Sequence, residues 1–174
     1  KVAISSEKTS LSAEFSVILR HQTLYICDRS MTDIRLLADI LHESKCSCVI
    51  YSRGETTSYS RRGVADLYGL LTESPEVLQG ALLADKVVGK GAAALMVLGG
   101  VREVYADVIS EPALAMLQSG KVAVGYGRVV PHIINRAGTG VCPVETLCTP
   151  CTTAAECLPL IAGFVARTSS LQSV

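Results

Sequence analysis

The residues best able to do chemistry lie in two short glycine-containing segments, 86–91 and 138–145. Within the first segment, Lys90 stands between two glycines at the start of a predicted helix. The positive end of a helix dipole disfavours a cation by up to about 1 kcal/mol. We therefore expect Lys90 to face an anion, either a bound ligand or a carboxylate of the fold itself. Lys86, one turn earlier and beside Asp85, is expected to form a surface ion pair and to support the site.

Neither segment completes a known nucleotide-binding motif. Lys90 lacks the upstream glycine spacing and the following Ser or Thr of a P-loop. Gly138, Thr139 and Gly140 begin like a dinucleotide fingerprint, but Pro143 stands where the third glycine is required. Both motifs are excluded by these departures.

The second segment predicts a helix start with Cys142 at the cap, Pro143 in the first turn and Glu145 two residues later. Unpaired backbone N–H groups at a helix N-terminus stabilise a thiolate, so Cys142 is a candidate nucleophile or metal ligand. Glu145 can instead close a capping box on its own helix, which is a structural role. The sequence leaves both interpretations open.

Four cysteines gather near the end of the chain: Cys142, Cys148, Cys151 and Cys157. The CxxC spacing of Cys148 and Cys151 suits zinc, iron–sulfur or redox chemistry. Two predicted helix starts separate the four thiols, so we expect no bound metal. A metal or redox module built on these cysteines stays an alternative.

Helix and strand patterns become clear after Asp33, which is a plausible helix cap. A strand at 46–51 and its hairpin partner at 55–59 follow the first helix, and Cys46 and Cys48 should share one buried strand face. The other expected strands cover 101–108 and 121–126, with an extended segment at 129–134. Further helices are expected from Gly63, from Pro75 through Leu83, and over 89–98, 110–118, 142–148 and 153–167.

From Gly89 onward, helices and strands alternate with short connections, which is typical of βαβ units in a parallel sheet. The hairpin adds antiparallel strands. The sequence therefore predicts a three-layer α/β/α sandwich with a mixed sheet of four or five strands. We expect residues 1–30 to form an arm or an added strand, 31–168 one domain, and 169–174 a frayed tail.

Composition narrows the partners and the compartment. Of 174 residues, 49% are hydrophobic, and 16 basic residues balance 16 acidic ones, so neither disorder nor a nucleic-acid partner is expected. The longest uncharged stretch, 91–101, is too short to span a bilayer, and the polar start lacks the apolar core of a signal peptide. We expect a cytoplasmic protein whose seven cysteines are mostly free thiols. Its Ala- and Leu-rich helices also suggest a homo-oligomer.

Residues 31–167 resemble a bacterial family of uncharacterised proteins, the domain of unknown function 1893, which is similar in fold to the cytidine deaminases. The resemblance rests on runs that occur in the family's order: RGVAD (62–66), ADKVVGKGAAAL (84–95), GGVREVY (99–105), ISEPA (109–113) and VPHIINRAGTGVCPVE (130–145).

In the deaminases, two helix N-termini converge to hold zinc and a catalytic Glu, through His or Cys followed by Ala-Glu and through Pro-Cys-x-x-Cys. This chain has Gly-Lys-Gly-Ala at 89–92, with no zinc ligand and no proton-shuttling acid, and Cys-Pro-Val-Glu at 142–145, where one thiol remains and a carboxylate takes the place of the other. The resemblance therefore implies the fold without zinc-dependent deamination and without a cofactor. It also implies that Lys90, Cys142 and Glu145 share a pocket.

These observations predict a domain that binds a small anionic or nucleotide-like molecule where two helix N-termini meet. The tentative catalytic residues are Lys90, Cys142 and Glu145. The expected ligand-binding residues are Lys86, Asn135, Arg136, Thr139 and Gly140. One alternative is a thiol-dependent enzyme with Cys142 as nucleophile; others are the cysteine-based metal or redox module and a deaminase fold kept for self-association.

Overall fold

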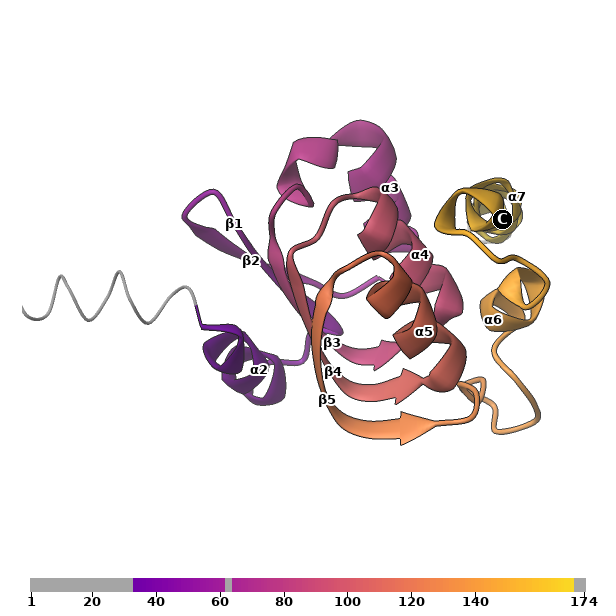
Figure 1. The fold of residues 1–174 in the computed structure, drawn as a ribbon, viewed down its shortest axis with the longest axis horizontal. Helices are drawn as coiled ribbons and strands as arrows, with labels where there is room; N and C mark the ends of the chain where they lie inside the picture. The colour runs from indigo at the N-terminus through magenta and orange to yellow at the C-terminus, as the bar shows by residue number, and fades with distance from the viewer. Residues whose placement is uncertain (1–32, 62–63, 171–174) are drawn as a thin grey trace, which may run out of the picture. The chain divides into compact units, whose positions relative to one another are not determined.

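A computed structural model describes residues 33–61 and 64–170. Apart from Asp33, these residues belong to one compact unit that begins at Ile34. Their strands form a mixed sheet in the order β2-β1-β3-β4-β5 (Figure 1). The strands are β1 (Cys48–Ser52), β2 (Glu55–Tyr59), β3 (Leu82–Val88), β4 (Glu103–Ser110) and β5 (Ala123–Val130). The predicted arm at 1–30 lies outside the described residues.

The sheet begins with the predicted hairpin. Ser52 of β1 pairs with Glu55 of β2, which leaves Arg53 and Gly54 as a two-residue turn. Both turn residues have positive φ angles, 55° and 88°. Positive φ at both central positions is the geometry of the type I′ turn that matches the twist of a hairpin. Strand β1 then pairs antiparallel with β3, while β3, β4 and β5 run parallel.

Helices cover both faces of the sheet, as the three-layer prediction requires (Figure 1). Helix α2 (Ile34–Glu43) packs on β1 and β3 from one side. On the other side lie α3 (Ala65–Glu73), α4 (Lys90–Leu98) and α5 (Glu111–Ser119), and α6 (Pro143–Cys148) and α7 (Ala154–Ser170) pack on α4. The predicted α/β sandwich is therefore confirmed, with five strands in the described residues.

Each face of the sheet has its own apolar cluster. The larger one joins the sheet to α3, α4, α5, α6 and α7, and the smaller one joins it to α2. Cys46 and Cys48 are both buried but belong to different clusters, so the prediction of a shared strand face is wrong. Cys46 precedes β1, and the alternation of a strand does not extend to it. The alanines at 92–94 of α4 are also buried.

One predicted element is wrong. The expected helix from Pro75 through Leu83 is only a 3-10 turn at Pro75–Val77, and Leu82 already lies in β3. The first three residues of β3 are all buried, and a short, fully apolar run does not distinguish a central strand from a buried helix. Strand β5 also runs unbroken to Val130. Among the described helices, none is both long and apolar enough to cross a lipid bilayer.

Candidate functional site

The carboxyl ends of the three parallel strands meet at the side chain of Glu145. Its Oε2 atom accepts hydrogen bonds from the backbone N–H of Lys90 and from the Ser110 hydroxyl, each at 3.1 Å. Its Oε1 atom accepts one from the Ile133 N–H, also at 3.1 Å. Glu145 is 2% exposed and Ser110 is fully buried. The carboxylate therefore occupies the position at the start of α4 where an external anion would otherwise be stabilised.

Glu145 does not close a capping box on its own helix. The N–H of Cys142, which such a box would use, donates to the Ile133 carbonyl at 2.7 Å. The carboxylate instead joins α6 to the starts of α4 and α5 and to the segment after β5. The capping-box interpretation is therefore wrong: the Glu145 carboxylate bonds to residues distant in sequence and not to the N–H of Cys142.

Two glycines allow α4 to approach α6 this closely. A methyl group on Gly89 would lie 2.5 Å from Oε2 of Glu145, and one on Gly91 would overlap the Val144 side chain. Neither glycine has a positive φ, so the requirement is for space and not for an unusual backbone. The Gly-Lys-Gly segment is thus a close-packing motif and not a phosphate loop.

The side chain of Lys90 explains why a cation stands at a helix N-terminus. Its ammonium group turns to the far end of α6 and donates to the carbonyls of Thr149, at 3.0 Å, and Cys151, at 2.7 Å. Carbonyls at a helix C-terminus lack partners and carry negative partial charge, so a lysine stabilises them. The first residue of α4 thus holds both ends of α6, and Lys90 is only 9% exposed. The ammonium group of Lys90 therefore faces backbone carbonyls and not the expected anion, and only its backbone N–H meets the Glu145 carboxylate.

The segment between β5 and α6 forms an ordered loop above Glu145, and it contains four of the predicted ligand-binding residues. The Asn135 side chain bonds Thr139 through both its oxygen and its nitrogen, and the Asn135 N–H donates to the Gly140 carbonyl. An antiparallel bridge joins Ile134 to Val141. Arg136 is exposed on this loop. Asn135, Thr139 and Gly140 therefore hold the loop together, whereas the Arg136 side chain faces solvent.

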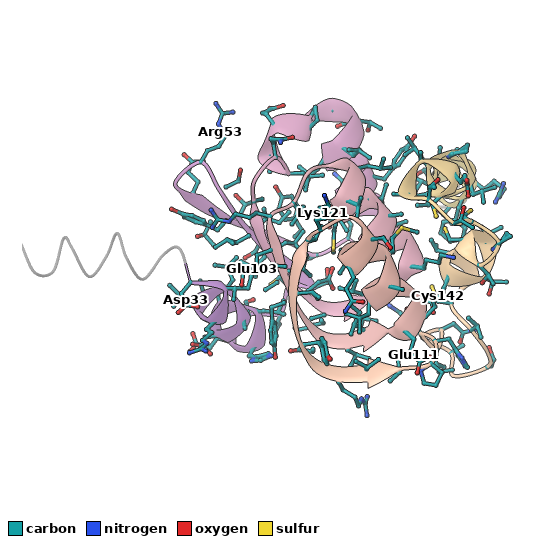
Figure 2. All side chains as sticks on the ribbon, viewed as in Figure 1. Asp33, Arg53, Glu103, Glu111, Lys121 and Cys142 are labelled. Atoms are coloured by element: carbon teal, nitrogen blue, oxygen red, sulfur yellow. The ribbon has the colours of Figure 1, made fainter. Side chains whose placement is uncertain are left out.

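Cys142 is half-buried at the start of α6 (Figure 2), and its thiol makes no capping hydrogen bond. The other described cysteines are buried. The Cys157 thiol lies in hydrogen-bonding contact with those of Cys148 and Cys151. Burial raises the pKa of the Cys148 and Cys157 thiols, which keeps them protonated at neutral pH. Cys142 is therefore the accessible thiol of the described chain.

The zinc of the cytidine deaminases does not fit this arrangement. Within 33–61 and 64–170, no group of three or more His, Cys, Asp or Glu side chains is placed to hold a metal ion. A zinc ligand must supply a lone pair, but Lys90, at the first helix start, is a hydrogen-bond donor through its N–H and ammonium groups. The Glu145 carboxylate already accepts three hydrogen bonds.

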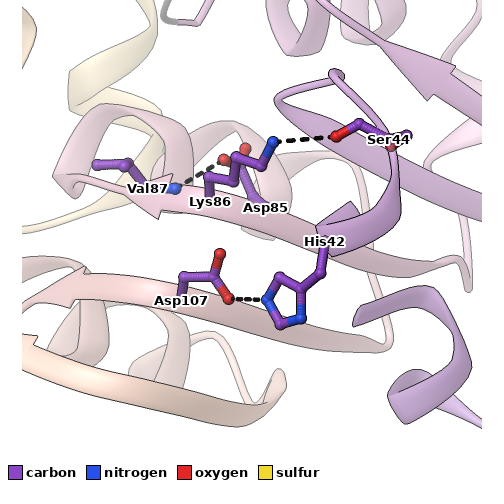
Figure 3. Close-up of polar contacts among 6 residues, drawn as sticks. All are labelled: His42, Ser44, Asp85, Lys86, Val87 and Asp107. Carbon is purple, nitrogen blue, oxygen red and sulfur yellow. Dashed lines mark hydrogen bonds and ion pairs between the residues drawn. The ribbon is translucent and has the colours of Figure 1, made fainter. Parts of the chain in front are cut away.

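Lys86 belongs to a different part of the molecule. Its ammonium group donates to the carbonyl of Ser44, just beyond α2, at 3.3 Å. Beside it, Nε2 of His42 lies 2.6 Å from Oδ1 of Asp107, which ties α2 to β4 (Figure 3). The predicted surface pair with Asp85 is not formed, since the Asp85 carboxylate accepts from the N–H of Val87. Sequence reasoning missed the His42–Asp107 contact, because 65 residues separate the two and no motif joins them.

Asp85 is the most perturbed carboxyl group of this second cluster. Its pKa is raised to about 7, mainly by burial; the hydrogen bond from the Val87 N–H opposes this rise, and the nearby charge of Asp107 adds to it. Tyr105, whose ring meets that of His42 edge-on, also has a raised pKa because of burial and of Asp107. His42, Tyr105 and Asp107 lie where α2 contacts the sheet, whereas Asp85 is in register with Cys48, which packs in the apolar cluster of the opposite face. The Glu145 centre lies at the starts of α4 and α6.

The family model for the domain of unknown function 1893 matches residues 36–165. The chain belongs to the DUF1893 family. A crystal structure of a DUF1893 family protein from Thermotoga maritima, TM1506, superposes with a TM-score of 0.68 at 25% sequence identity. The match covers 75% of this chain and 88% of that one. No curated protein matches the chain.

The DUF1893 match agrees with the runs that suggested it, and it includes every residue of the Glu145 centre. The structure brings together the two helix starts that contain Lys90 and Cys142, with Glu145 between them. The structure does not place Lys86 near Glu145, because the Lys86 ammonium group bonds to Ser44. It also adds Ser110, which the sequence placed only at the start of the helix predicted over 110–118, because its contact with Glu145 is visible only in three dimensions.

Proposed function

We propose that this domain binds a small anionic ligand of nucleotide-like size on the outer surface of the loop at 131–142. The anionic group would contact Arg136, and an apolar ring would lie on Ile134 and Val141, which are 53% and 37% exposed. Lys90 and Glu145 would support this surface from below without touching the ligand, because their polar atoms are buried and bonded.

The observation that carries the proposal is an exposed loop held rigid at the carboxyl ends of parallel strands. Ligands of open α/β sheets bind in this position. Glu145 holds the loop from below through Ile133, and the Asn135–Thr139 contacts hold it from within. A loop ordered before binding loses less entropy when the ligand arrives. Exposed large aliphatic side chains beside an exposed guanidinium suit a ligand with one apolar and one anionic part.

A titration monitored by backbone NMR tests the proposal. Nucleoside 5′-monophosphates, free nucleosides and inorganic phosphate are added in separate arms to the full chain. We expect the monophosphates to shift the resonances of 131–142 most, and Arg136→Ala to weaken binding at least about fivefold, or roughly 1 kcal/mol.

The matched control is Arg102→Ala. Arg102 is an exposed arginine next to the amino end of β4, at the opposite end of the parallel strands from the loop, and its loss changes the net charge equally. Equal binding by the wild type and the Arg136 variant would contradict the proposal, as would shifts confined to other parts of the sheet.

A thiol-dependent enzyme is the second candidate, favoured by one observation: Cys142 is half-buried, whereas the other described cysteines are buried. The rate of alkylation at neutral pH, compared with that of free cysteine, distinguishes the two. An activated nucleophile reacts faster than the free amino acid because more of it is thiolate. A rate no faster than that of free cysteine would rule out this candidate while leaving the loop proposal intact.

Zinc-dependent deamination is not part of the proposal. Purified protein should contain less than stoichiometric zinc and should not turn over cytidine or adenosine. Stoichiometric zinc together with turnover would contradict this expectation.

A further inference from the structure

Three buried cysteines meet where the end of α6 packs against the first turn of α7. The Cys157 thiol lies in hydrogen-bonding contact with the thiols of Cys148 and Cys151. All three belong to the larger apolar cluster, and the exposed fractions of Cys148, Cys151 and Cys157 are 0%, 8% and 0%. The ligand surface proposed at 131–142 involves none of these thiols.

The packing around α4 places the Cys148 sulfur against α7 as well. A methyl group on Gly91 of α4 would lie 3.6 Å from Sγ of Cys148 and 3.6 Å from Cδ1 of Ile161. Ile161 follows Cys157 by one helical turn, so the two fully buried side chains lie on the same face of α7. The Cys148 sulfur therefore lies at the face of α7 to which Cys157 belongs.

Hydrogen bonds fix the backbone of Cys151 beside the same face. Its N–H donates to the Cys148 carbonyl at 3.1 Å, which folds the CxxC segment into a turn at the end of α6. Its carbonyl accepts a hydrogen bond from the Lys90 ammonium group at 2.7 Å. Helix α7 begins only three residues later, at Ala154. The thiols are thus held together by the fold, which raises their effective concentration far above that of separate molecules.

We propose that Cys151 and Cys157 form an intramolecular disulfide bond when the protein reacts with hydrogen peroxide. Cys151 is the residue that the peroxide reaches, because it is the least buried of the three cysteines. Cys157 is its partner, because the two thiols are in contact across the junction of α6 and α7. This modification site is independent of the ligand surface at 131–142.

The bond forms in two steps. The Cys151 sulfur first attacks one oxygen of the peroxide, and the O–O bond breaks, which gives a sulfenic acid and one molecule of water. The Cys157 sulfur then attacks the Cys151 sulfur, the S–O bond breaks, and the hydroxyl group leaves with the Cys157 proton as a second water. Two electrons pass from the two sulfurs to the peroxide. Cys148 keeps its thiol.

Burial and proximity have opposite effects on Cys157. Burial raises the pKa of its thiol, which makes it a weak nucleophile towards dissolved reagents. Its attack on Cys151 takes place inside the folded protein, between sulfurs that are already in contact, and this proximity offsets the low fraction of thiolate. Peroxide therefore joins two thiols of which one is too deeply buried for a larger alkylating reagent.

Peroxide treatment followed by mass spectrometry tests the disulfide bond. The full chain with Cys27→Ser and Cys142→Ser lacks the half-buried thiol and the thiol outside the described residues. It is incubated with hydrogen peroxide, and the remaining thiols are then blocked with N-ethylmaleimide in urea. Thermal unfolding monitored by circular dichroism checks that this chain and each variant made in it are folded.

Digestion with a protease that cleaves after glutamate distinguishes the possible pairs. Cleavage after Glu156 places Cys157 in the peptide 157–174, separate from the peptide that contains both Cys148 and Cys151. We expect peroxide to join these two peptides and dithiothreitol to separate them again. Peptides that stay separate at every peroxide concentration at which the protein remains folded would overturn the proposal.

Single variants identify the partner of Cys157. Cys151→Ser should slow the joining of the two peptides at least about tenfold, because the remaining thiol of the CxxC segment is fully buried. Cys148→Ser is the matched control and should leave the rate unchanged. Cys46 and Cys48 are an internal control, since both are buried but belong to different clusters, and they should stay thiols. Joining at the full rate in Cys151→Ser, or an equally fast Cys46–Cys48 disulfide, would contradict the proposal.

Discussion

At the scale of single residues, Lys90 and Glu145 are two buried charges that are stabilised by separate sets of partners. Glu145 accepts two backbone N–H groups and one hydroxyl, and Lys90 donates to two carbonyls. An unpaired buried charge costs several kcal/mol, which good hydrogen bonds offset. The two residues that looked like parts of a ligand site are therefore internal parts of the fold.

The thiols differ in accessibility, and this difference predicts an order of modification. In a Cys27→Ser background, which removes the cysteine outside the described residues, iodoacetamide should modify Cys142 of the native protein first. Cys148 and Cys157 should react only after unfolding, because they are fully buried and burial raises their pKa. Mass spectrometry of the native and the urea-treated protein gives the order. Native labelling of Cys148 or Cys157 as fast as that of Cys142 would contradict the prediction.

At the scale of elements, the close contact between α4 and α6 depends on the absence of a side chain at Gly91. Gly91→Ala should destabilise the protein by about 1–3 kcal/mol, because its methyl group would overlap Val144. Gly69→Ala is the matched control. Gly69 lies in α3 with open space around its Cα, so the same change should be neutral or stabilising there. Urea unfolding measures both variants, and equal effects would show that the close contact is not limiting.

The raised pKa of Asp85, on β3, predicts a dependence of stability on pH. The folded protein binds a proton at Asp85 more tightly than the unfolded chain does, since the folded pKa is about 7 and the ordinary value is 3.8. The stabilisation from this group is complete below about pH 4, and it is lost as the pH rises towards 7. Asp85→Asn removes the titration and keeps the acceptor oxygen that bonds Val87.

The measurement is urea unfolding of the wild type and of Asp85→Asn at a series of pH values. Between about pH 4.5 and about pH 8, the stability of the variant relative to the wild type should rise by at least about 1 kcal/mol. A difference that stays constant across this range would show that Asp85 titrates normally in the folded state.

Elements with a distinctive local pattern could be predicted from the sequence. The hairpin, α4, the Ser110 cap of α5 and the Cys-Pro start of α6 lie where the patterns placed them. Strand β3 could not be predicted, because its first residues are all buried and give no alternation. The partners of Glu145 could not be predicted either, because they come from three segments up to 55 residues away. Only the fold brings these segments together, and no local sequence pattern indicates that they are neighbours.

At the scale of the whole molecule, one carboxylate joins the carboxyl ends of the three parallel strands. The groups that follow β3, β4 and β5 are, respectively, the start of α4, the cap of α5 and the loop at 131–142, and each donates one hydrogen bond to Glu145. The Glu145 carboxylate is therefore buried and fully hydrogen-bonded, and the exposed loop at 131–142 is left as the candidate binding surface. The DUF1893 match covers this whole arrangement.

The central claim, that Glu145 is the internal anion on which these elements meet, is tested most directly by urea unfolding of Glu145→Gln. Glutamine keeps the shape but places an amide NH₂ against donors. We therefore predict a loss of about 2–4 kcal/mol in the free energy of unfolding. Glu73→Gln, an exposed change at the end of α3, should stay within about 0.5 kcal/mol of the wild type. If the Glu145 variant unfolds at the same urea concentration as the wild type, the claim is wrong.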